Sequence, residues 1–287
     1  MSTGFTRTTA VPLFYRVDGH GDPLLLLHGG PGAHHDYLYP QMLALAERHR
    51  VVTYDQRGGG QSKTDDPAPI TWQTQVDDLA QVLAELGVAP PGSGGATVVG
   101  YSWGALLAML YAVQATAQAT MPPVARLVLV SPAPISRAWR DEFETTLAVR
   151  GRSDTIRAMR DTLAASGLRE SDPAAFRQRS FELSVAGYFA DPARATALTP
   201  FRVTGKVQQS VWQSLGDFDL RQSLRAVRVP TLVIHGRQDP IPLASATAAA
   251  EALGGECVVL EACGHVPYVE RPDALFPAIE RFLTATR

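Results

Sequence analysis

One serine stands in a pattern that is typical of nucleophilic catalysis. Ser102 lies in Gly100-Tyr101-Ser102-Trp103-Gly104, between an apolar run over 96–100 and an alanine- and leucine-rich stretch over 103–119. The run predicts a strand and the stretch predicts a helix. The glycines allow a sharp turn between them, from which the hydroxyl projects at the helix N-terminus. This context favours a nucleophile over a serine that only caps a helix.

A serine hydroxyl needs a base to remove its proton and a carboxylate to orient that base. His265 follows the last predicted strand, over 257–260, and Asp239 follows a strand predicted over 231–234. Loops at the carboxyl ends of parallel strands meet at one edge of a sheet. We therefore predict Ser102 as nucleophile, His265 as base and Asp239 as acid, with Asp219 as the second choice for the acid.

The oxyanion of an acyl-transfer reaction needs backbone donors that are already in position. The run HGGPG at 28–32 follows a strand predicted over 24–28, and its glycines let the backbone approach a substrate. We expect the N–H groups of Gly30 and Trp103 to be the two donors. Gly29 and Tyr101 are expected to contact the substrate.

Strands and helices alternate along most of the chain. Strands are predicted over 13–17, 24–28, 51–54, 96–100, 127–130, 231–234 and 257–260, and helices over 39–48, 71–86, 103–119, 243–253 and 272–284. A loop rich in Pro, Gly and Ser is predicted over 89–95. Because parallel strands need long crossovers, which are usually helical, the alternation predicts an α/β fold with a mostly parallel central sheet flanked by helices.

The region 134–214 interrupts this alternation. It contains no comparable strand and is rich in arginine, alanine and scattered aromatic residues. We predict a helical cap over 134–214, inserted into a core domain formed by 1–133 and 215–287. An insertion at a strand end is well placed to form a lid.

The composition indicates which classes of binding partner and which cellular location to expect. Twenty-six basic and 28 acidic residues give a formal net charge of −2 without a long run of like charge, so neither nucleic acid nor an anionic membrane is expected as a partner. No apolar run has the length of a signal peptide core or a membrane span, and two cysteines are too few for a disulfide framework, so we expect a cytoplasmic protein. No spacing of His, Cys, Asp and Glu predicts a metal site.

Five motifs together resemble those of a known family: HGGPG at 28–32, DQRGGGQS at 55–62, GYSWG at 100–104, HGRQD at 235–239 and ACGH at 262–265. They are similar to motifs of proline iminopeptidases, which are serine peptidases of the α/β-hydrolase superfamily. The resemblance covers the core but not the insertion. It implies an α/β-hydrolase fold with a helical cap after the sixth core strand, a Ser-Asp-His hydrolase without a cofactor, and a structural turn at 55–57. It also supports Gly30 and Trp103 as oxyanion donors.

An aminopeptidase of this type must bind the free amino group of its substrate. A buried ammonium without a partner is costly, so a cap carboxylate is expected near the serine. Glu142, Glu144 and Glu182 are candidates, although no motif identifies them. Tyr101 stands where such enzymes commonly carry Gly or His, which leaves the substrate less defined than the chemistry.

Three functions are consistent with these residues. The first is an aminopeptidase of the proline iminopeptidase type, which cleaves a small amide or short peptide through an acyl-enzyme. The second is an esterase, lactonase or amidase of the same fold, in which aromatic cap residues define the pocket. The third is a ligand-binding relative without catalysis. An inward-facing cap carboxylate would favour the first, and the oligomeric state is open.

Overall fold

The computed structural model describes residues 1–89 and 94–286, so residues 90–93 of the predicted loop lie outside the described residues. Eight strands form one sheet in the order β1-β2-β4-β3-β5-β6-β7-β8. They are β1 (Ser2–Phe5), β2 (Phe14–Asp18), β3 (Asp22–Leu27), β4 (His49–Tyr54), β5 (Ala96–Tyr101), β6 (Val124–Val130), β7 (Thr231–Gly236) and β8 (Glu256–Leu260). β2 pairs antiparallel with β1 and β4, and all other pairs are parallel.

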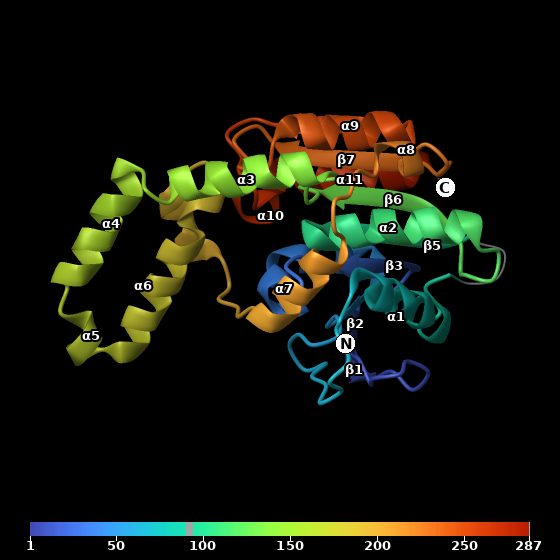
Figure 1. Ribbon diagram of the computed structural model, residues 1–287, viewed down its shortest axis with the longest axis horizontal. Coiled ribbons are helices and arrows are strands. Elements are labelled where there is room, and N and C mark those ends of the chain that lie inside the picture. The colour runs from blue at the N-terminus through green and yellow to red at the C-terminus, as the bar shows by residue number, and fades with distance from the viewer. Residues whose placement is uncertain (90–93, 287) are drawn as a thin grey trace.

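Helices cover both faces of this sheet (Figure 1). One face packs against α1 (Trp72–Glu85), α2 (Trp103–Ala117), α8 (Arg221–Leu224) and α9 (Leu243–Leu253). The other packs against the 3-10 segments η1 (His35–Leu38) and η2 (Gln41–Glu47), and against α10 (Pro267–Glu270) and α11 (Pro272–Ala285). Leu24 and Leu26 face the second layer, whereas Leu25 and Leu27 face the first. Burial on both faces explains the unbroken leucine run of β3.

The segment between β6 and β7 is mostly helical, apart from one isolated β-bridge between Ser136 and Asp219. It contains α3 (Arg137–Arg150), α4 (Asp154–Ala165), α5 (Leu168–Ser171), α6 (Pro173–Val185), η3 (Ala186–Tyr188), η4 (Pro192–Ala197) and α7 (Gly205–Ser214). In Figure 1, α4, α5 and α6 form an arm that projects from the sheet, while α7 lies against the core. Val207 and Val211 of α7 join the same apolar cluster as α1 and α2.

Most predicted elements are confirmed, and the differences lie in short segments. Where a helix is expected over 39–48, the structure has the 3-10 segment η2 (Gln41–Glu47), which begins only after Pro40, a residue that lacks a backbone N–H. The sequence pattern does not predict β1, α8 or α10. Both cysteines are free thiols. Among residues 1–89 and 94–286, no helix combines the length and apolarity required to cross a membrane.

Candidate active site

The turn between β5 and α2 holds Ser102 in an unusual backbone conformation. Its φ is +53° and its ψ is −117°, a region that residues other than glycine rarely adopt. Its N–H donates to the Val130 carbonyl at 3.0 Å, and its own carbonyl accepts the Ala133 N–H at 3.0 Å. Bonds to the end of β6 and the residues after it therefore hold the strained turn, as expected where strain serves function.

The two glycines of the serine motif are required by close backbone contacts. A Cβ atom on Gly104 would lie 2.4 Å from the Leu27 carbonyl oxygen. A Cβ atom on Gly100 would lie 2.6 Å from the Gly104 carbonyl oxygen. Both distances are far below normal van der Waals contact. The motif therefore allows α2 to begin directly against β3 and β5.

The three residues predicted as nucleophile, base and acid lie in one chain of hydrogen bonds. The Ser102 hydroxyl lies 2.9 Å from His265 Nε2, and His265 Nδ1 lies 2.8 Å from Asp239 Oδ2. Because an ionised carboxylate can only accept, the proton belongs on Nδ1, and Nε2 is left to accept from the serine. The other Asp239 oxygen accepts the Ile241 N–H at 2.8 Å. The structure thus brings together residues from three loops at the carboxyl ends of β5, β7 and β8.

The surroundings of Asp239 favour its ionised form. Burial of its side chain opposes ionisation, but the neighbouring His265 and His235 and the Ile241 N–H outweigh it, so the pKa of Asp239 is lowered. His235 is itself fully buried, and its Nε2 lies 3.0 Å from the Ile241 carbonyl. Asp219, the second choice for the acid, forms an ion pair with Arg221 on the surface and is not in this chain of hydrogen bonds.

Two tyrosine rings enclose the imidazole of His265. Tyr101 lies 5.3 Å from it and Tyr188 lies 5.4 Å from it, measured between ring centroids, at interplanar angles of 39° and 37°. The Tyr188 carbonyl also accepts the His265 N–H at 2.7 Å. Tyr188 belongs to η3 of the helical insertion. The insertion therefore contacts both the ring and the backbone of this histidine.

A buried carboxyl group that the sequence analysis missed supports the same loop. Glu270 Oε2 accepts the Gly264 N–H at 2.7 Å, and its Oε1 accepts the Ala190 N–H at 2.7 Å. Burial raises the pKa of Glu270, and the bonds from backbone N–H groups oppose this shift. Arg194 donates to the Glu270 carbonyl at 2.8 Å. Glu270 thus links Gly264, the residue next to His265, to the helical segment between β6 and β7. In the sequence, only the position of Glu270 five residues after the histidine could have suggested this supporting role.

A polar network fixes the glycine loop after β3. The Gln56 N–H donates to His28 Nε2 at 3.1 Å, and the Gln56 side-chain amide donates to the His28 carbonyl at 2.8 Å. Trp103 Nε1 donates to the side-chain oxygens of Gln56 at 2.9 Å and Gln75 at 3.0 Å. Burial lowers the pKa of His28 to about 4, so the ring is neutral at pH 7. The glycine loop and the start of α2 therefore share one anchor.

The two residues predicted to supply oxyanion donors, Gly30 and Trp103, lie in the glycine loop and at the start of α2. Gly30 has a φ of +59° and lines the cavity beside His265. Trp103 is the first residue of α2, where backbone N–H groups have no acceptor within the helix. The Gly29 N–H donates to the Tyr37 hydroxyl at 2.6 Å, and a Cβ atom on Gly29 would lie 2.9 Å from Ser102 Cβ. The backbone of this loop thus passes directly beside the serine.

The motif at 55–62 forms a turn held by its own side chains. Asp55 accepts the His35 N–H at 2.9 Å and the Gln61 N–H at 2.8 Å. Arg57 forms a two-point ion pair with the buried Asp78 of α1, with Nε donating at 2.8 Å. These contacts position Gln56, the residue between them, which holds the glycine loop.

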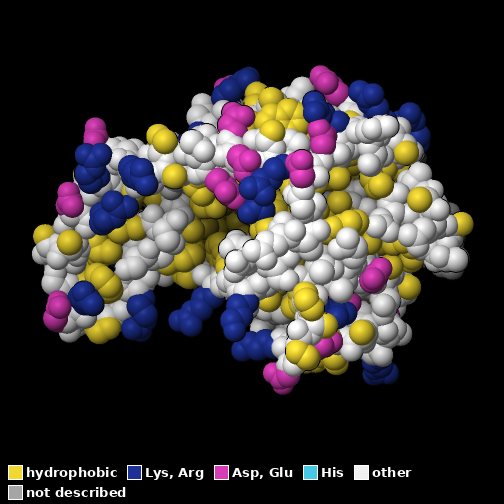
Figure 2. Space-filling view, in the orientation of Figure 1, with side chains coloured by type: hydrophobic (Ala, Val, Ile, Leu, Met, Phe, Trp, Pro, Cys, Tyr) yellow, Lys and Arg dark blue, Asp and Glu magenta, His cyan; other side chains and the backbone are white. Residues whose placement is uncertain are grey.

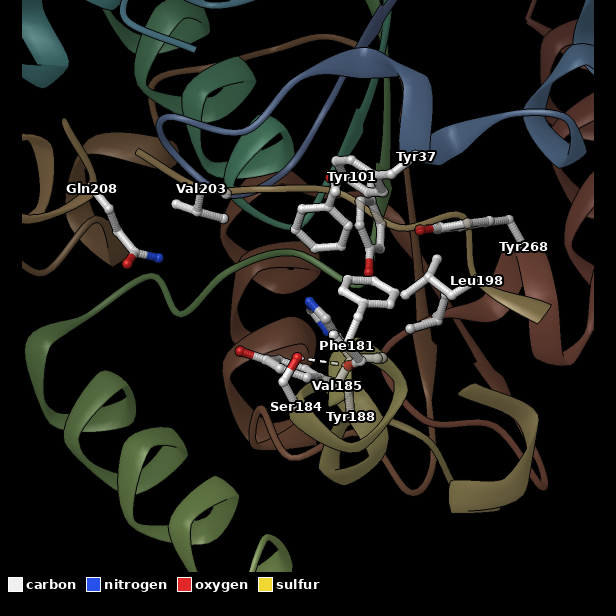
Figure 3. Close-up of a pocket in the computed structure, with 14 residues that line it drawn as sticks. Tyr37, Tyr101, Phe181, Ser184, Val185, Tyr188, Leu198, Val203, Gln208 and Tyr268 are labelled. Atoms are coloured by element: carbon white, nitrogen blue, oxygen red, sulfur yellow. Dashed lines mark hydrogen bonds between the residues drawn. The ribbon is translucent and has the colours of Figure 1, made fainter. Parts of the chain in front are cut away.

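A cavity of about 350 Å³ lies between the core and the insertion, beside His265 and Gly30. Figure 2 shows hydrophobic side chains gathered in the hollow between the projecting arm and the core. Besides His265 and Gly30, the cavity is lined by Tyr37, Tyr101, Phe181, Ser184, Val185, Tyr188, Leu198, Phe201, Val203, Gln208, Val266 and Tyr268 (Figure 3). No Asp, Glu, Lys or Arg of the described ranges is among them. The pocket formed by the described residues is therefore aromatic and contains no acidic or basic side chain of the Asp, Glu, Lys or Arg type.

The three glutamates proposed to bind an amino group lie elsewhere. Glu142 is exposed on α3, and Glu144 pairs with Arg140 at 2.8 Å in an adjoining hollow. Glu182 is buried, but it accepts hydrogen bonds from Arg179 at 2.8 Å and Gln178 at 3.0 Å and lines a separate hollow between α4 and α6. These partners already satisfy Glu144 and Glu182. The expected carboxylate is thus not supplied to the pocket from these positions.

Within the part of the chain that the structure describes, no three His, Cys, Asp or Glu side chains converge as a metal site would require. The residues in and next to the cavity wall instead offer the hydroxyl–imidazole–carboxylate series of Ser102, His265 and Asp239, together with phenol hydroxyls. Such an arrangement can transfer a proton, form a covalent bond at the serine and stabilise an oxyanion.

The chain is similar to several known hydrolases. It is 24% identical over 288 residues to a proline iminopeptidase of Lactobacillus crispatus, covering 94% of each sequence. It is 30% identical over 277 residues to a pimeloyl-[acyl-carrier protein] methyl ester esterase of Xanthomonas campestris, covering 94% of this chain and 98% of that one. The crystal structure of a proline iminopeptidase from Mycobacterium smegmatis superposes with a TM-score of 0.70 at 22% identity, covering 99% and 98% of the two chains.

A model of the alpha/beta hydrolase family matches residues 24–278. This match begins within β3 and ends within α11, and it includes the serine turn, the two loops after β7 and β8, and the helical segment between β6 and β7. The mostly parallel sheet between two helical layers is the fold of the same family. The chain belongs to the alpha/beta hydrolase family.

Proposed function

We propose that the protein is a serine hydrolase that cleaves a small, uncharged ester, lactone or amide through an acyl-enzyme. One observation carries this proposal. The Ser102 hydroxyl, the His265 imidazole and the Asp239 carboxylate form a continuous series of hydrogen bonds, at 2.9 and 2.8 Å, beside an aromatic pocket. A serine, a base and an orienting acid in this order are what nucleophilic acyl transfer needs.

In the first half of the reaction, Ser102 Oγ attacks the substrate carbonyl carbon while its proton moves to His265 Nε2. Asp239 stabilises the resulting imidazolium. The tetrahedral oxyanion accepts hydrogen bonds from the N–H groups of Gly30 and Trp103. The loss of one such donor typically raises the activation free energy by ~2.7–4 kcal/mol. Collapse of the intermediate breaks the bond to the leaving group, which takes the proton from His265.

In the second half, water attacks the acyl-enzyme and gives a proton to His265. The tetrahedral intermediate collapses, the acid is released, and the proton returns to Ser102 Oγ. The pKa of Asp239 is lowered by its histidine neighbours, and this favours a carboxylate that remains charged through both halves.

We further propose that residues 134–214 act as a cap on a core of 1–133 and 215–287. Phe181 and Val185 of α6 and Tyr188 of η3 supply part of the pocket wall. Substrate preference would then depend on the cap, and the chemical step mainly on the core.

The lining of the pocket supports neutral substrates. A charged group in a cavity without a charged partner is costly to bury. Phe201 packs against Tyr37 at a centroid distance of 4.3 Å and an interplanar angle of 30°. Because such aromatic side chains form much of the wall, apolar acyl groups suit it. An ester hydrolase is accordingly our first candidate.

An aminopeptidase is the second candidate, because the similarity to proline iminopeptidases extends over 94% of the chain. It would need a carboxylate for the free amino group of its substrate. Glu144 is one hollow away, and Tyr188 and Gln208 line both hollows. To bind the amino group of a substrate, Glu144 would have to give up its ion pair with Arg140.

Two measurements test these proposals. A fluorophosphonate probe should label the wild-type protein and not Ser102→Ala; equal labelling would refute Ser102 as the nucleophile. A proline arylamide, its N-acetylated form and a short p-nitrophenyl ester should then be compared. We expect the ester to be the best substrate, with no loss on acetylation of the arylamide. A strict requirement for the free amine would favour the aminopeptidase.

A further inference from the structure

We propose that Arg150, at the end of α3, is a positioning residue that holds the loop of Asp239 against the loop of His265. We call these two segments, 237–241 and 261–265, the acid loop and the base loop. The inference rests on the proposed function and adds to it a residue that acts on the chemical step without touching the substrate. The helical insertion thereby supports the rate of the reaction as well as the shape of the pocket.

Gln238, which directly precedes Asp239, joins the two loops. Its N–H donates to the Cys263 carbonyl at 2.8 Å, and its side-chain oxygen accepts the Cys263 N–H at 3.0 Å. The backbones also touch next to this pair, since a Cβ atom on Gly236 would clash with the Cys263 carbonyl oxygen. The pairing of Gln238 with Cys263 therefore fixes the separation between Asp239 and His265.

The insertion binds the remaining backbone group of Gln238. Arg150 Nη1 donates to the Gln238 carbonyl. The side chain of Arg150 is partly buried, and it forms no ion pair with an Asp or Glu in the part of the chain that the structure describes. A hydrogen bond from a charged donor is stronger than one between neutral groups. The contact therefore ties α3 to the acid loop.

The direction of this side chain distinguishes a positioning role from a role within α3. An arginine in the last turn of a helix often serves its own helix, because the C-terminus of a helix favours a cation. Here the guanidinium instead reaches a carbonyl of the acid loop. Burial lowers the pKa of Arg150, and the charges of Asp239 and Glu270 oppose this shift. The cation therefore faces the region of the proposed acid.

The end of α3 and η3 pack together, so the insertion holds both loops from one place. A Cβ atom on Gly187 would lie 3.6 Å from Arg150 Cβ, in ordinary van der Waals contact. The next residue of η3, Tyr188, accepts the His265 N–H through its carbonyl at 2.7 Å. In Figure 1, α3 leads from the core to the projecting arm. A movement of this part of the insertion would change the contacts to Gln238 and His265 together.

Steady-state kinetics of Arg150→Met tests the role. Methionine keeps an unbranched side chain but removes the donor and the charge. The kcat value should fall by about 10- to 100-fold, the range of one hydrogen bond from a charged group, with KM changed by less than about twofold. Fluorophosphonate titration of the active sites corrects kcat for any misfolded fraction. Arg150→Lys keeps a charged donor and should recover most of the loss.

Arg152→Met is the matched control, because Arg152 is exposed two residues further along the chain. It should keep the wild-type kcat and KM. Gln238→Leu, which removes the acceptor for the Cys263 N–H, should lower kcat by about 2- to 12-fold with little change in KM. The inference is overturned if either Arg150→Met or Gln238→Leu keeps the wild-type kcat. It is also overturned if Arg150→Met mainly raises KM, as expected of a residue that only shapes the pocket.

Amide hydrogen exchange separates this inference from the proposed function, because it needs no turnover. Peptides that cover the two loops are compared in wild type, Arg150→Met and Arg152→Met. Loss of the tie should speed exchange of the Gln238 and Cys263 N–H groups by about 10-fold in Arg150→Met alone. If wild type cleaves no ester but this acceleration occurs, the function is wrong and the tie stands. Equal exchange in wild type and Arg150→Met overturns the tie.

Discussion

Acidification from near pH 7 to near pH 5 should destabilise the protein through His28. This buried ring is neutral: Nδ1–H donates to the Gly29 carbonyl at 2.8 Å, and Nε2 accepts the Gln56 N–H at 3.1 Å. A second proton would make Nε2 a donor that faces another donor. Burial lowers the pKa of His28 to about 4, even though the Asp55 charge raises it.

The magnitude follows from the two pKa values. The unfolded chain has a histidine pKa of about 6.5, so between about pH 6.5 and pH 4 it binds a proton that the folded protein does not bind. The contribution of His28 to stability is therefore complete above the unfolded pKa and decreases as the pH falls through this window. Each pH unit below the unfolded pKa lowers the free energy of unfolding by about 1.4 kcal/mol, so about 1.5 units, down to pH 5, lower it by about 2 kcal/mol.

Urea unfolding near pH 7 and near pH 5 measures this loss. His28→Gln keeps an acceptor for the Gln56 N–H but cannot titrate, so its free energy of unfolding should fall by about 2 kcal/mol less than that of wild type. His20→Gln, in an exposed turn, is the control and should behave as wild type. An equal loss in wild type and His28→Gln would refute the reasoning.

Three further predictions concern the residues around the serine. Asp239→Asn should lower kcat by about 10⁴-fold, because an amide does not hold the histidine in the required tautomer; steady-state kinetics measures this, and a change below tenfold would contradict it. Glu270→Gln should cost about 2 kcal/mol in urea unfolding and lower kcat more than it changes KM, since an amide oxygen can accept only one of the two backbone N–H groups; the exposed Glu261→Gln should do neither. Gly104→Ala should lower both the free energy of unfolding and the rate of fluorophosphonate labelling, because its methyl group would lie 2.4 Å from a backbone oxygen of β3; unchanged values for both would show that the contact is not needed.

Most of the fold could be predicted because burial leaves a strong sequence pattern. The leucine run of β3 and the periodic apolar residues of α1 are examples, and the capping box at Thr71 and Thr74 marks the start of α1. β1 left no such signal: Ser2–Phe5 is short, mostly exposed and pairs with β2 alone, so its stability comes from pairing rather than from burial. A pattern-based prediction has nothing to detect there.

The candidate site divides in the same way. The serine, histidine and acid lie in short motifs at strand ends, where sequence and position coincide. The pocket wall does not lie in such motifs. Its aromatic residues come from four segments that only the folded chain brings together, and they include Tyr37, Phe181, Phe201 and Tyr268. No spacing along the sequence predicts which aromatic residues meet, and none shows that Glu182 already has partners beside it.

The contacts of η3 with His265 limit how this scaffold can be redesigned. The Tyr188 carbonyl and the Ala190 N–H reach the loop of the proposed base directly or through Glu270. A chimera that exchanged all of 134–214 for the matching part of a relative would replace these supports together with the pocket wall. Libraries aimed at new substrates should therefore vary the inner side chains of α6 and keep 186–194 as a fixed part of the catalytic frame.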